Sequence, residues 1–129
     1  AMGHLLGNAV RLTPHDDILV VGEGIETMLS LFEAAPGLPV WAALSSGHLG
    51  AVLLPEDLQR LYIAIDRDPA GQRAAERLSA RATEVGIAAQ VLEPLLGDFN
   101  DDLQANGRLA LRQHLAGQIG LEDRHRLLG

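Results

Sequence analysis

Four short runs of apolar residues are spaced along the sequence, and they set the fold. The runs cover residues 18–21, 40–44, 61–65 and, less uniformly, 88–92. Each is too short for a helix and apolar on both faces, as in parallel strands that are covered on both sides. Stretches with helical spacing lie between them, and these cover residues 25–35, one short turn at 55–60, and residues 69–85.

The longest helical stretch carries its own boundary signals. Asp68 is a favourable N-cap, Pro69 suits the first helical position, and Gly86 suits a C-terminal stop. Its apolar stripe extends from Ala74 to Val85. In the preceding stretch, Met28, Leu29 and Phe32 are expected to share one apolar face, by the same helical spacing. The stretches at 25–35 and 69–85 are therefore predicted to be two helices that connect strands of the sheet.

The alternation of strands and helices predicts an α/β fold. The expected architecture is a central, mainly parallel four-stranded sheet that is flanked by helices and joined by right-handed crossovers. A chain of 129 residues is long enough for one domain. We expect a core over about 16–103, an N-terminal arm over 1–15 and a C-terminal helical extension over 104–129. Alternating residues at 10–12 are a candidate for a short extra strand.

Composition excludes several kinds of chemistry. The chain has no cysteine and no lysine, which excludes thiolate metal sites, cysteine nucleophiles and Schiff-base catalysis. No apolar run approaches the ~18 residues of a transmembrane helix, so we expect a cytoplasmic location without membrane contact. The net charge is −7, whereas duplex-binding domains are usually basic. Contact with nucleic acid would therefore require a local basic patch or another domain.

Acidic residues follow three of the four predicted strands. They are Glu23 and Glu26 after the first strand, Asp66 and Asp68 after the third, and Asp98 and Asp101 after the fourth. The carboxyl ends of parallel strands meet at one edge of the sheet, where ligands of such folds bind. Carboxylates gathered there repel one another unless a cation lies among them. Mg²⁺ suits such a site because it prefers oxygen ligands, and Mn²⁺ is a plausible substitute.

Each acidic group also has a simpler interpretation. Glu23 is favourable near a helix N-terminus, Asp68 is a helix cap, and Asp98 and Asp101 fit a solvated turn followed by another cap. These interpretations leave Asp66 unexplained, because it ends a buried apolar strand and needs a partner or a cation. They also leave unexplained why all three groups share one edge.

Other motifs are weaker. Residues 22–24 (Gly-Glu-Gly) lack the third glycine of a dinucleotide-binding loop. The Asp-x-Asp at 66–68 is shared with haloacid-dehalogenase-type phosphatases, which usually need a lysine that this chain lacks. Residues 45–48 (Ser-Ser-Gly-His) have no nucleophile elbow, so we expect a turn. Tyr62 lies within a predicted buried strand, which excludes it as a nucleophile.

Arginines accompany the second acidic group. Arg67 lies between the two aspartates, and Arg73, Arg77 and Arg81 recur at four-residue spacing along the next helix. The simpler interpretation is a solvated helix face paired with nearby glutamates. The functional interpretation is that Arg67, Arg73 and Arg77 contact phosphates of a nucleic acid, or that this face binds a neighbouring domain.

Five segments in order resemble the Toprim domain, found in bacterial-type primases, topoisomerases and some nucleases. The first segment is the strand end Val-Val-Gly. The other four read Glu-Gly-Ile-Glu-Thr, Ala-Leu-Ser, Asp-x-Asp-Pro-Ala-Gly and Gly-Asp-Phe-Asn-Asp. The likeness covers about residues 8–103 and is strongest to the Toprim variant of plasmid, phage and integrative-element primases. It implies a Rossmann-like Toprim fold.

The resemblance also implies roles for individual residues. Glu23 would be the general acid/base, or an additional ligand, at the reacting phosphate, and Asp66 and Asp68 would hold Mg²⁺. Asp98 and Asp101 would complete the site, with room for a second metal. Glu26 and Asn100 are second-tier candidates.

The function implied is Mg²⁺-dependent nucleotidyl or phosphoryl transfer by a primase-like protein in DNA replication. Its partners would be single-stranded DNA, nucleotides and other domains of a primase or primase-helicase polypeptide. Two alternatives remain open from the sequence. One is a nuclease-type Toprim that hydrolyses phosphodiesters, and the other is a non-catalytic module that binds metal and nucleic acid or docks a partner.

Overall fold

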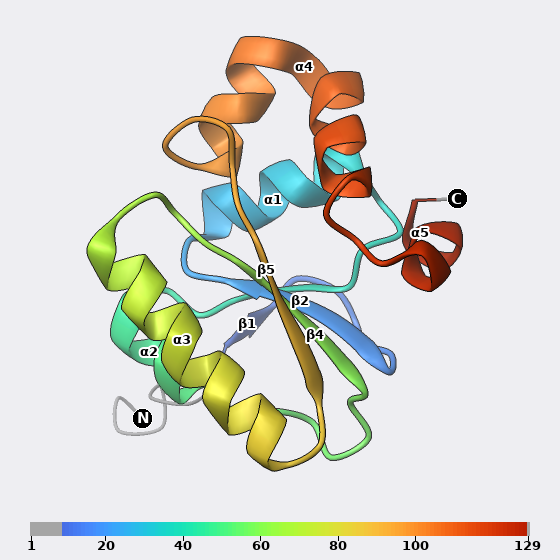
Figure 1. The fold of residues 1–129 in the computed structure, drawn as a ribbon. Coiled ribbons are helices and arrows are strands. Elements are labelled where there is room, and N and C mark those ends of the chain that lie inside the picture. The colour runs from blue at the N-terminus through green and yellow to red at the C-terminus, as the bar shows by residue number, and fades with distance from the viewer. Residues whose placement is uncertain (1–8, 129) are drawn as a thin grey trace.

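The computed structural model describes residues 9–128 and contains one α/β domain (Figure 1). Its elements in chain order are β1 (Val10–Arg11), β2 (Ile18–Gly22), α1 (Ile25–Ala34), β3 (Val40–Ala42), α2 (Ser46–Ala51), β4 (Arg60–Ala64), α3 (Pro69–Glu84), β5 (Ala88–Leu92), α4 (Phe99–Ala116) and α5 (Leu121–Leu127). The expected alternation of strands and helices is confirmed. Residues 1–8 of the expected N-terminal arm lie outside the described residues, and Val10–Arg11 of the arm form β1.

The strands form one sheet in the order β1-β3-β2-β4-β5. The four predicted strands, β2 to β5, pair in parallel, and β1 adds a two-residue antiparallel edge against β3. The sheet is therefore five-stranded and mainly parallel, with the short extra strand at the N-terminal candidate segment. Because β2 and β4 are neighbours, the residues that follow them leave the sheet side by side.

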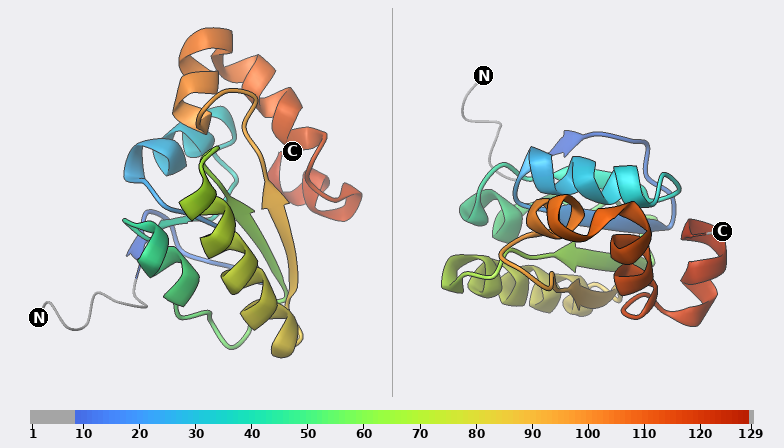
Figure 2. Two further views of the ribbon diagram at one scale, coloured as in Figure 1. Left: turned by 60° about the vertical axis from the view of Figure 1, so that its left-hand side comes forward. Right: turned by 90° about the horizontal axis from the view of Figure 1, so that it is seen from above.

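Helices cover both faces of the sheet (Figure 2). Alternate residues of β2 point to opposite faces: Ile18 and Val20 join a core with α1, α4 and α5, while Leu19 and Val21 join a second core with α2 and α3. All four side chains are fully buried. This double burial explains why the strand sequences are continuously apolar rather than alternating.

Three local expectations were wrong. The short helix before β4 is α2, not the segment 55–60, and it includes the residues expected to form a turn at 46–48. Val85 is the C-cap of α3 and is 70% exposed, because the helix ends before this position can face the sheet. On α1, Met28 packs into the core, whereas Leu29 and Phe32 lie on the exposed side.

The C-terminal helix is tied to the sheet by a buried polar contact. The hydroxyl of Tyr62 on β4 donates to Oδ2 of Asp123 (2.5 Å) and accepts from the backbone N–H of Gly120 (3.1 Å). Arg60 completes the contact through an ion pair with Asp123 (2.7 Å). Burial raises the pKa of Tyr62 to about 12, with a further contribution from Asp123. The phenol is therefore a proton donor at neutral pH, and its burial fits the expectation that it is not a nucleophile.

Replacing this hydroxyl is expected to lower stability without disturbing the sheet. Tyr62→Phe keeps the ring but removes one donor from a buried carboxylate and one acceptor from a backbone N–H. We expect a loss of about 2 kcal/mol in the free energy of unfolding, because buried polar groups left unpaired cost about 1–3 kcal/mol. Urea denaturation at pH 7 measures it. An unchanged midpoint would show that the contact does not anchor α5.

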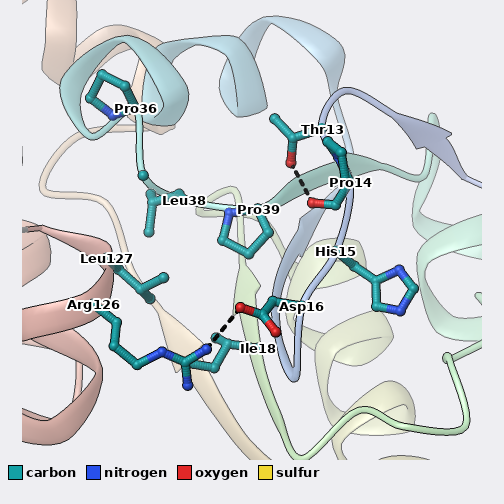
Figure 3. A pocket seen from close by; sticks show the side chains of 11 residues that line it. Thr13, Pro14, His15, Asp16, Ile18, Pro36, Leu38, Pro39, Arg126 and Leu127 are labelled. Carbon is teal, nitrogen blue, oxygen red and sulfur yellow. Dashed lines mark hydrogen bonds and ion pairs between the residues drawn. The ribbon is translucent and has the colours of Figure 1, made fainter.

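A cavity of about 330 Å³ lies where α5 meets the segments before β2 and β3 (Figure 3). On its rim Arg126 pairs with Asp16 (2.9 Å) and Asp17 (2.5 Å). Arg126 holds the pKa of the Asp17 carboxyl below its usual range. The cavity lies near the amino ends of the strands, and no predicted site residue lines it. No helix within residues 9–128 is long and apolar enough to span a membrane.

Candidate functional site

Three carboxylates converge at the carboxyl edge of the sheet. Glu23 follows β2, while Asp66 and Asp68 follow the neighbouring strand β4. One oxygen from each of the three side chains lies within 4.8 Å of the others. Of the first two acidic groups, Glu23, Asp66 and Asp68 are thus brought together in the structure, and Glu26 is not among them. We refer to Glu23, Asp66 and Asp68 as the acidic trio.

Close backbone packing places the trio. A Cβ atom added to Gly22 would lie 2.5 Å from Sδ of Met28 and 3.0 Å from the carbonyl oxygen of Ala64, so the strand end before Glu23 has no room for a side chain. A Cβ at Gly71 would lie 3.1 Å from the carbonyl oxygen of Asp66 and 3.2 Å from Oδ1 of Asp68. The first turn of α3 therefore packs directly onto the Asp-x-Asp segment.

Asp68 is both a helix cap and a member of the trio. Its Oδ1 accepts a hydrogen bond from the backbone N–H of Gly71 (2.6 Å), which fixes the start of α3. Its Oδ2 accepts no hydrogen bond from the described part of the chain, residues 9–128. A structural role as N-cap and a role as metal ligand are therefore compatible, because a carboxylate has two oxygens.

Burial and neighbouring negative charges perturb the ionisation of Asp66 in the acidic trio. The pKa of Asp66 is raised from 3.8 to about 6, first by burial and then by the negative charges of Glu23 and Asp98. A hydrogen bond with Glu23 and the charge of Asp68 act in the same direction. A carboxylate held in this way at neutral pH carries uncompensated charge, which a divalent cation would relieve. Mg²⁺ and Mn²⁺ fit this set of side chains, since all three offer carboxylate oxygens.

This raised pKa predicts a pH-dependent effect of Asp66→Asn in the metal-free protein. Asp66 titrates near 6 when folded and near its ordinary 3.8 when unfolded, so wild-type stability falls as pH rises between these values. The Asn variant lacks this penalty. We expect it to be more stable than wild type at pH 7, by a margin that shrinks below pH 6 and vanishes near pH 4.

Urea denaturation in EDTA at pH 4, 5, 6 and 7 measures the margin. Ionisable groups that lie away from the trio and Asp98 contribute almost equally to both proteins and cancel in the difference. A variant that is less stable than wild type at pH 7 would contradict the assignment of an uncompensated charge to Asp66.

The acids after β5 lie outside the trio. Asp98 is the N-cap of α4, where its Oδ1 accepts from the backbone N–H of Asp101 (2.7 Å). It is nevertheless close enough for its charge to raise the pKa of Asp66. Asp101 is exposed in the first turn of α4. Their roles as metal ligands stay predictions, with Asp98 the better placed of the two.

The second-tier candidates take different positions. The amide oxygen of Asn100 accepts from the hydroxyl of Ser30 (3.0 Å), which links α4 to α1. Glu26 lies exposed in the first turn of α1 and makes no side-chain hydrogen bond within residues 9–128.

Asp102 has a structural role that the sequence analysis did not assign. It is 1% exposed and accepts from the backbone N–H groups of Leu95 (2.8 Å) and Leu96 (2.7 Å). These bonds hold the loop that carries Asp98. The signal was its helical spacing, because Asp102 lies three residues after the buried Phe99 and so on the same face.

Two of the predicted arginines bind backbone carbonyl groups of neighbouring segments. The Nε of Arg67 donates to the carbonyl oxygen of Pro94 (2.9 Å), which joins the Asp-x-Asp segment to the β5–α4 loop. On α3, Arg81 donates to the carbonyl oxygen of Gly50 in α2 (2.9 Å), and the guanidinium of Arg77 packs against the same glycine. Arg73 is exposed. The simpler interpretation of a purely solvated face therefore does not hold for Arg81, which is tied to α2, whereas Arg77 is exposed.

Ser46 is a contact of the trio that the sequence analysis missed. Its hydroxyl donates to Oε1 of Glu23. The segment was expected to be a turn without a role, and only its Ala-Leu-Ser likeness to the Toprim pattern marked it.

Comparisons with known proteins concern the fold that carries these residues. Residues 18–108 match the Toprim domain family. The fold is similar to a structure of the Aquifex aeolicus primase (zinc-binding and RNA polymerase domains), with 22% identity and a TM-score of 0.57 over 83% of this chain and 27% of that one. It is also similar to the primase fragment of the bacteriophage T7 primase-helicase protein, with 20% identity and a TM-score of 0.59 over 80% of this chain and 44% of that one.

No curated protein sequence matches this chain. The chain spans only 27% and 44% of the two primase structures, so the likeness concerns one part of each. Toprim domains bind divalent metal, and the acidic trio lies within the matched segment. The match covers well over half of the described residues and confirms the Toprim fold expected from the sequence. The chain belongs to the Toprim domain family.

Proposed function

We propose that this chain is the Mg²⁺-dependent nucleotidyl-transfer domain of a primase-type protein that acts on a single-stranded DNA template in replication. The observation that carries the proposal is the acidic trio, with its three carboxylates within 4.8 Å and one perturbed member. The fold shared with two primase fragments supports the choice of reaction. Nucleotides, template and other domains of a primase or primase-helicase polypeptide are its proposed partners.

The chemistry follows from the residues of the trio. Phosphoryl and nucleotidyl transfer need charge neutralisation and in-line positioning rather than a protein nucleophile. Asp66 and Asp68 would hold Mg²⁺, which neutralises the phosphates of an incoming nucleotide when bound. Glu23, held beside them, would take a proton from the attacking hydroxyl or give one to the leaving group. Asp98 is proposed to complete the site from the β5–α4 loop, with Asp101 as a further ligand.

The direct test uses the complete natural protein with single-stranded DNA, nucleoside triphosphates and Mg²⁺ or Mn²⁺. Products longer than a dinucleotide that depend on both template and metal would support the primase assignment. Shortened DNA without synthesis would overturn it in favour of the nuclease alternative. Metal binding with neither product would overturn it in favour of the non-catalytic module.

The arginines of α3 give a separate prediction about template binding. We expect the double variant Arg73→Ala/Arg77→Ala to bind single-stranded DNA more weakly. The slope of log affinity against log salt should become shallower by roughly one to two, because fewer phosphate contacts are made on binding and fewer counterions are released. Filter binding at several salt concentrations measures this.

The matched control for this prediction is Arg108→Ala, an exposed arginine on α4. It removes a positive charge away from α3 and should leave the salt slope unchanged. Equal slopes for wild type and the double variant would remove α3 from the proposed DNA contact.

A further inference from the structure

We propose that Ser46 is a positioning residue, and that its hydroxyl, together with the backbone of Ala43 and Leu44 in the β3–α2 loop (residues 43–45), holds Glu23 in one orientation at the acidic trio. The inference rests on the proposed function, since it concerns how Glu23 acts there. The hydroxyl of Ser46 donates to Oε1 of Glu23, across 23 positions of sequence. Both side chains are partly buried, so the contact is sheltered from water.

The same loop also holds the backbone of the Glu23 segment. The N–H of Ala43 donates to the carbonyl oxygen of Gly22 (2.7 Å), and the N–H of Leu44 donates to that of Glu23 (2.6 Å). The pairing of β3 with β2 thus continues up to Glu23 itself. Backbone and side chain of this residue are fixed by one neighbouring segment.

Leu44 reaches this position at a conformational cost. Its φ of 82° makes it the one non-glycine residue within 9–128 with a positive φ. A branched side chain strongly disfavours this region, and such strain is retained where the surrounding structure enforces it. At Leu44 the chain makes its Glu23 contact and then turns so that the two following serines reach the start of α2.

The two serines have different tasks. The side chain of Ser45 caps α2 by accepting from the backbone N–H of His48 (3.1 Å). Ser46 is the first residue of α2, and the cap does not need its hydroxyl, which donates to Glu23 instead. The residues are adjacent and chemically identical, so they form a matched pair for experiment.

The helix that carries Ser46 is itself fixed. Arg81 of α3 donates to the carbonyl oxygen of Gly50 (2.9 Å), and a Cβ at Gly50 would lie 3.4 Å from the guanidinium of Arg77. A glutamate side chain has several rotamers in water. A donor on a fixed helix selects one of them, and catalysis is sensitive to such placement, since an error of about 1 Å can cost ~10²-fold in rate.

The experiment compares Ser46→Ala, Ser46→Thr and Ser45→Ala in the complete natural protein, with Glu23→Gln as reference. We expect Ser46→Ala to lower kcat for primer synthesis about tenfold or more. KM for the template and the Mn²⁺ concentration for half-maximal melting-temperature shift should stay within about twofold. Ser46→Thr keeps the hydroxyl and should restore most of kcat. Ser45→Ala should lower the melting temperature yet keep kcat, when assayed where it is folded.

Crystal structures of the Ser46 variants give a readout besides activity. We expect one ordered Glu23 rotamer in the Thr variant and altered or multiple rotamers in the Ala variant. Wild-type kcat in Ser46→Ala, or equal kcat losses in Ser46→Ala and Ser45→Ala, would overturn the inference. If Glu23→Gln is inactive in that case, the proposed function survives. If Glu23→Gln is fully active, the role of Glu23 in the proposed function fails first.

Discussion

The Glu23→Gln protein is expected to lose nearly all turnover while it remains folded and binds metal. Gln is isosteric with Glu and can still accept the hydrogen bond from Ser46. It cannot take up a proton at the reacting phosphate. General acid–base groups contribute typically ~10²–10⁴-fold, so kcat for primer synthesis should fall by about that factor. Affinity for single-stranded DNA should hardly change, because no phosphate contact is removed.

Glu33→Gln is the matched control for this result. It makes the same chemical change at an exposed position on α1, and its activity should equal that of wild type. Steady-state kinetics in the complete protein, with melting temperatures of all three forms, provide the measurement. Normal primer synthesis or cleavage with Gln at position 23 would show that Glu23 is not the acid/base, and the docking alternative would then gain support.

Mn²⁺ is expected to raise the melting temperature of the chain, and Asp66→Asn should abolish that increase. A ligand that binds only the folded protein stabilises it by ~2.7 kcal/mol at one hundred times its dissociation constant, which corresponds to several degrees for a domain of this size. Asp66 is partly buried beside Glu23 and Asp68, so its loss removes one of the two residues proposed to hold the metal. Asp57→Asn, exposed and before β4 rather than after it, is the control.

The expected behaviour of Asp66→Asn without metal makes this test more specific. The same Asp66→Asn variant should be more stable than wild type without metal at pH 7 and insensitive to Mn²⁺ with it. A variant that is merely misfolded cannot satisfy both. Thermal scans with EDTA and with millimolar MnCl₂ give both numbers, and a full Mn²⁺ shift in the variant would place the metal away from the trio. Asp98→Asn in the same assay tests whether that residue completes the site.

The positions of the main elements follow from local sequence. The runs that form β2 and β3 and most of β4 are apolar over a length that suits only a strand. Helix α3 begins at its Asp68-Pro69 signal and ends before Gly86 as expected. These signals act over a few residues, so they can be recognised in the sequence without the tertiary structure. The shared edge of Glu23 and Asp66 also follows from sequence, because parallel topology puts all strand ends at one side.

Contacts between distant segments were decided by tertiary packing. Ser46 reaches Glu23 only because β3 lies beside β2 and the chain turns at Leu44. The Nε of Arg67 donates to the carbonyl oxygen of Pro94, since the β5–α4 loop passes beside it. The hydrophobic periodicity of a sequence does not predict such contacts, because they depend on the angle and register between separate strands and helices.

The acidic residues show the division most clearly. The sequence determined which acids leave the sheet at one edge, because strand polarity alone fixes that. It did not determine that one oxygen of Asp98 would cap α4, or that Asp102 would be buried and bind the β5–α4 loop. A carboxylate is equally suited to a cation, a backbone N–H or an arginine. Which of these it meets depends on how closely the helices pack, and only the folded structure decides that.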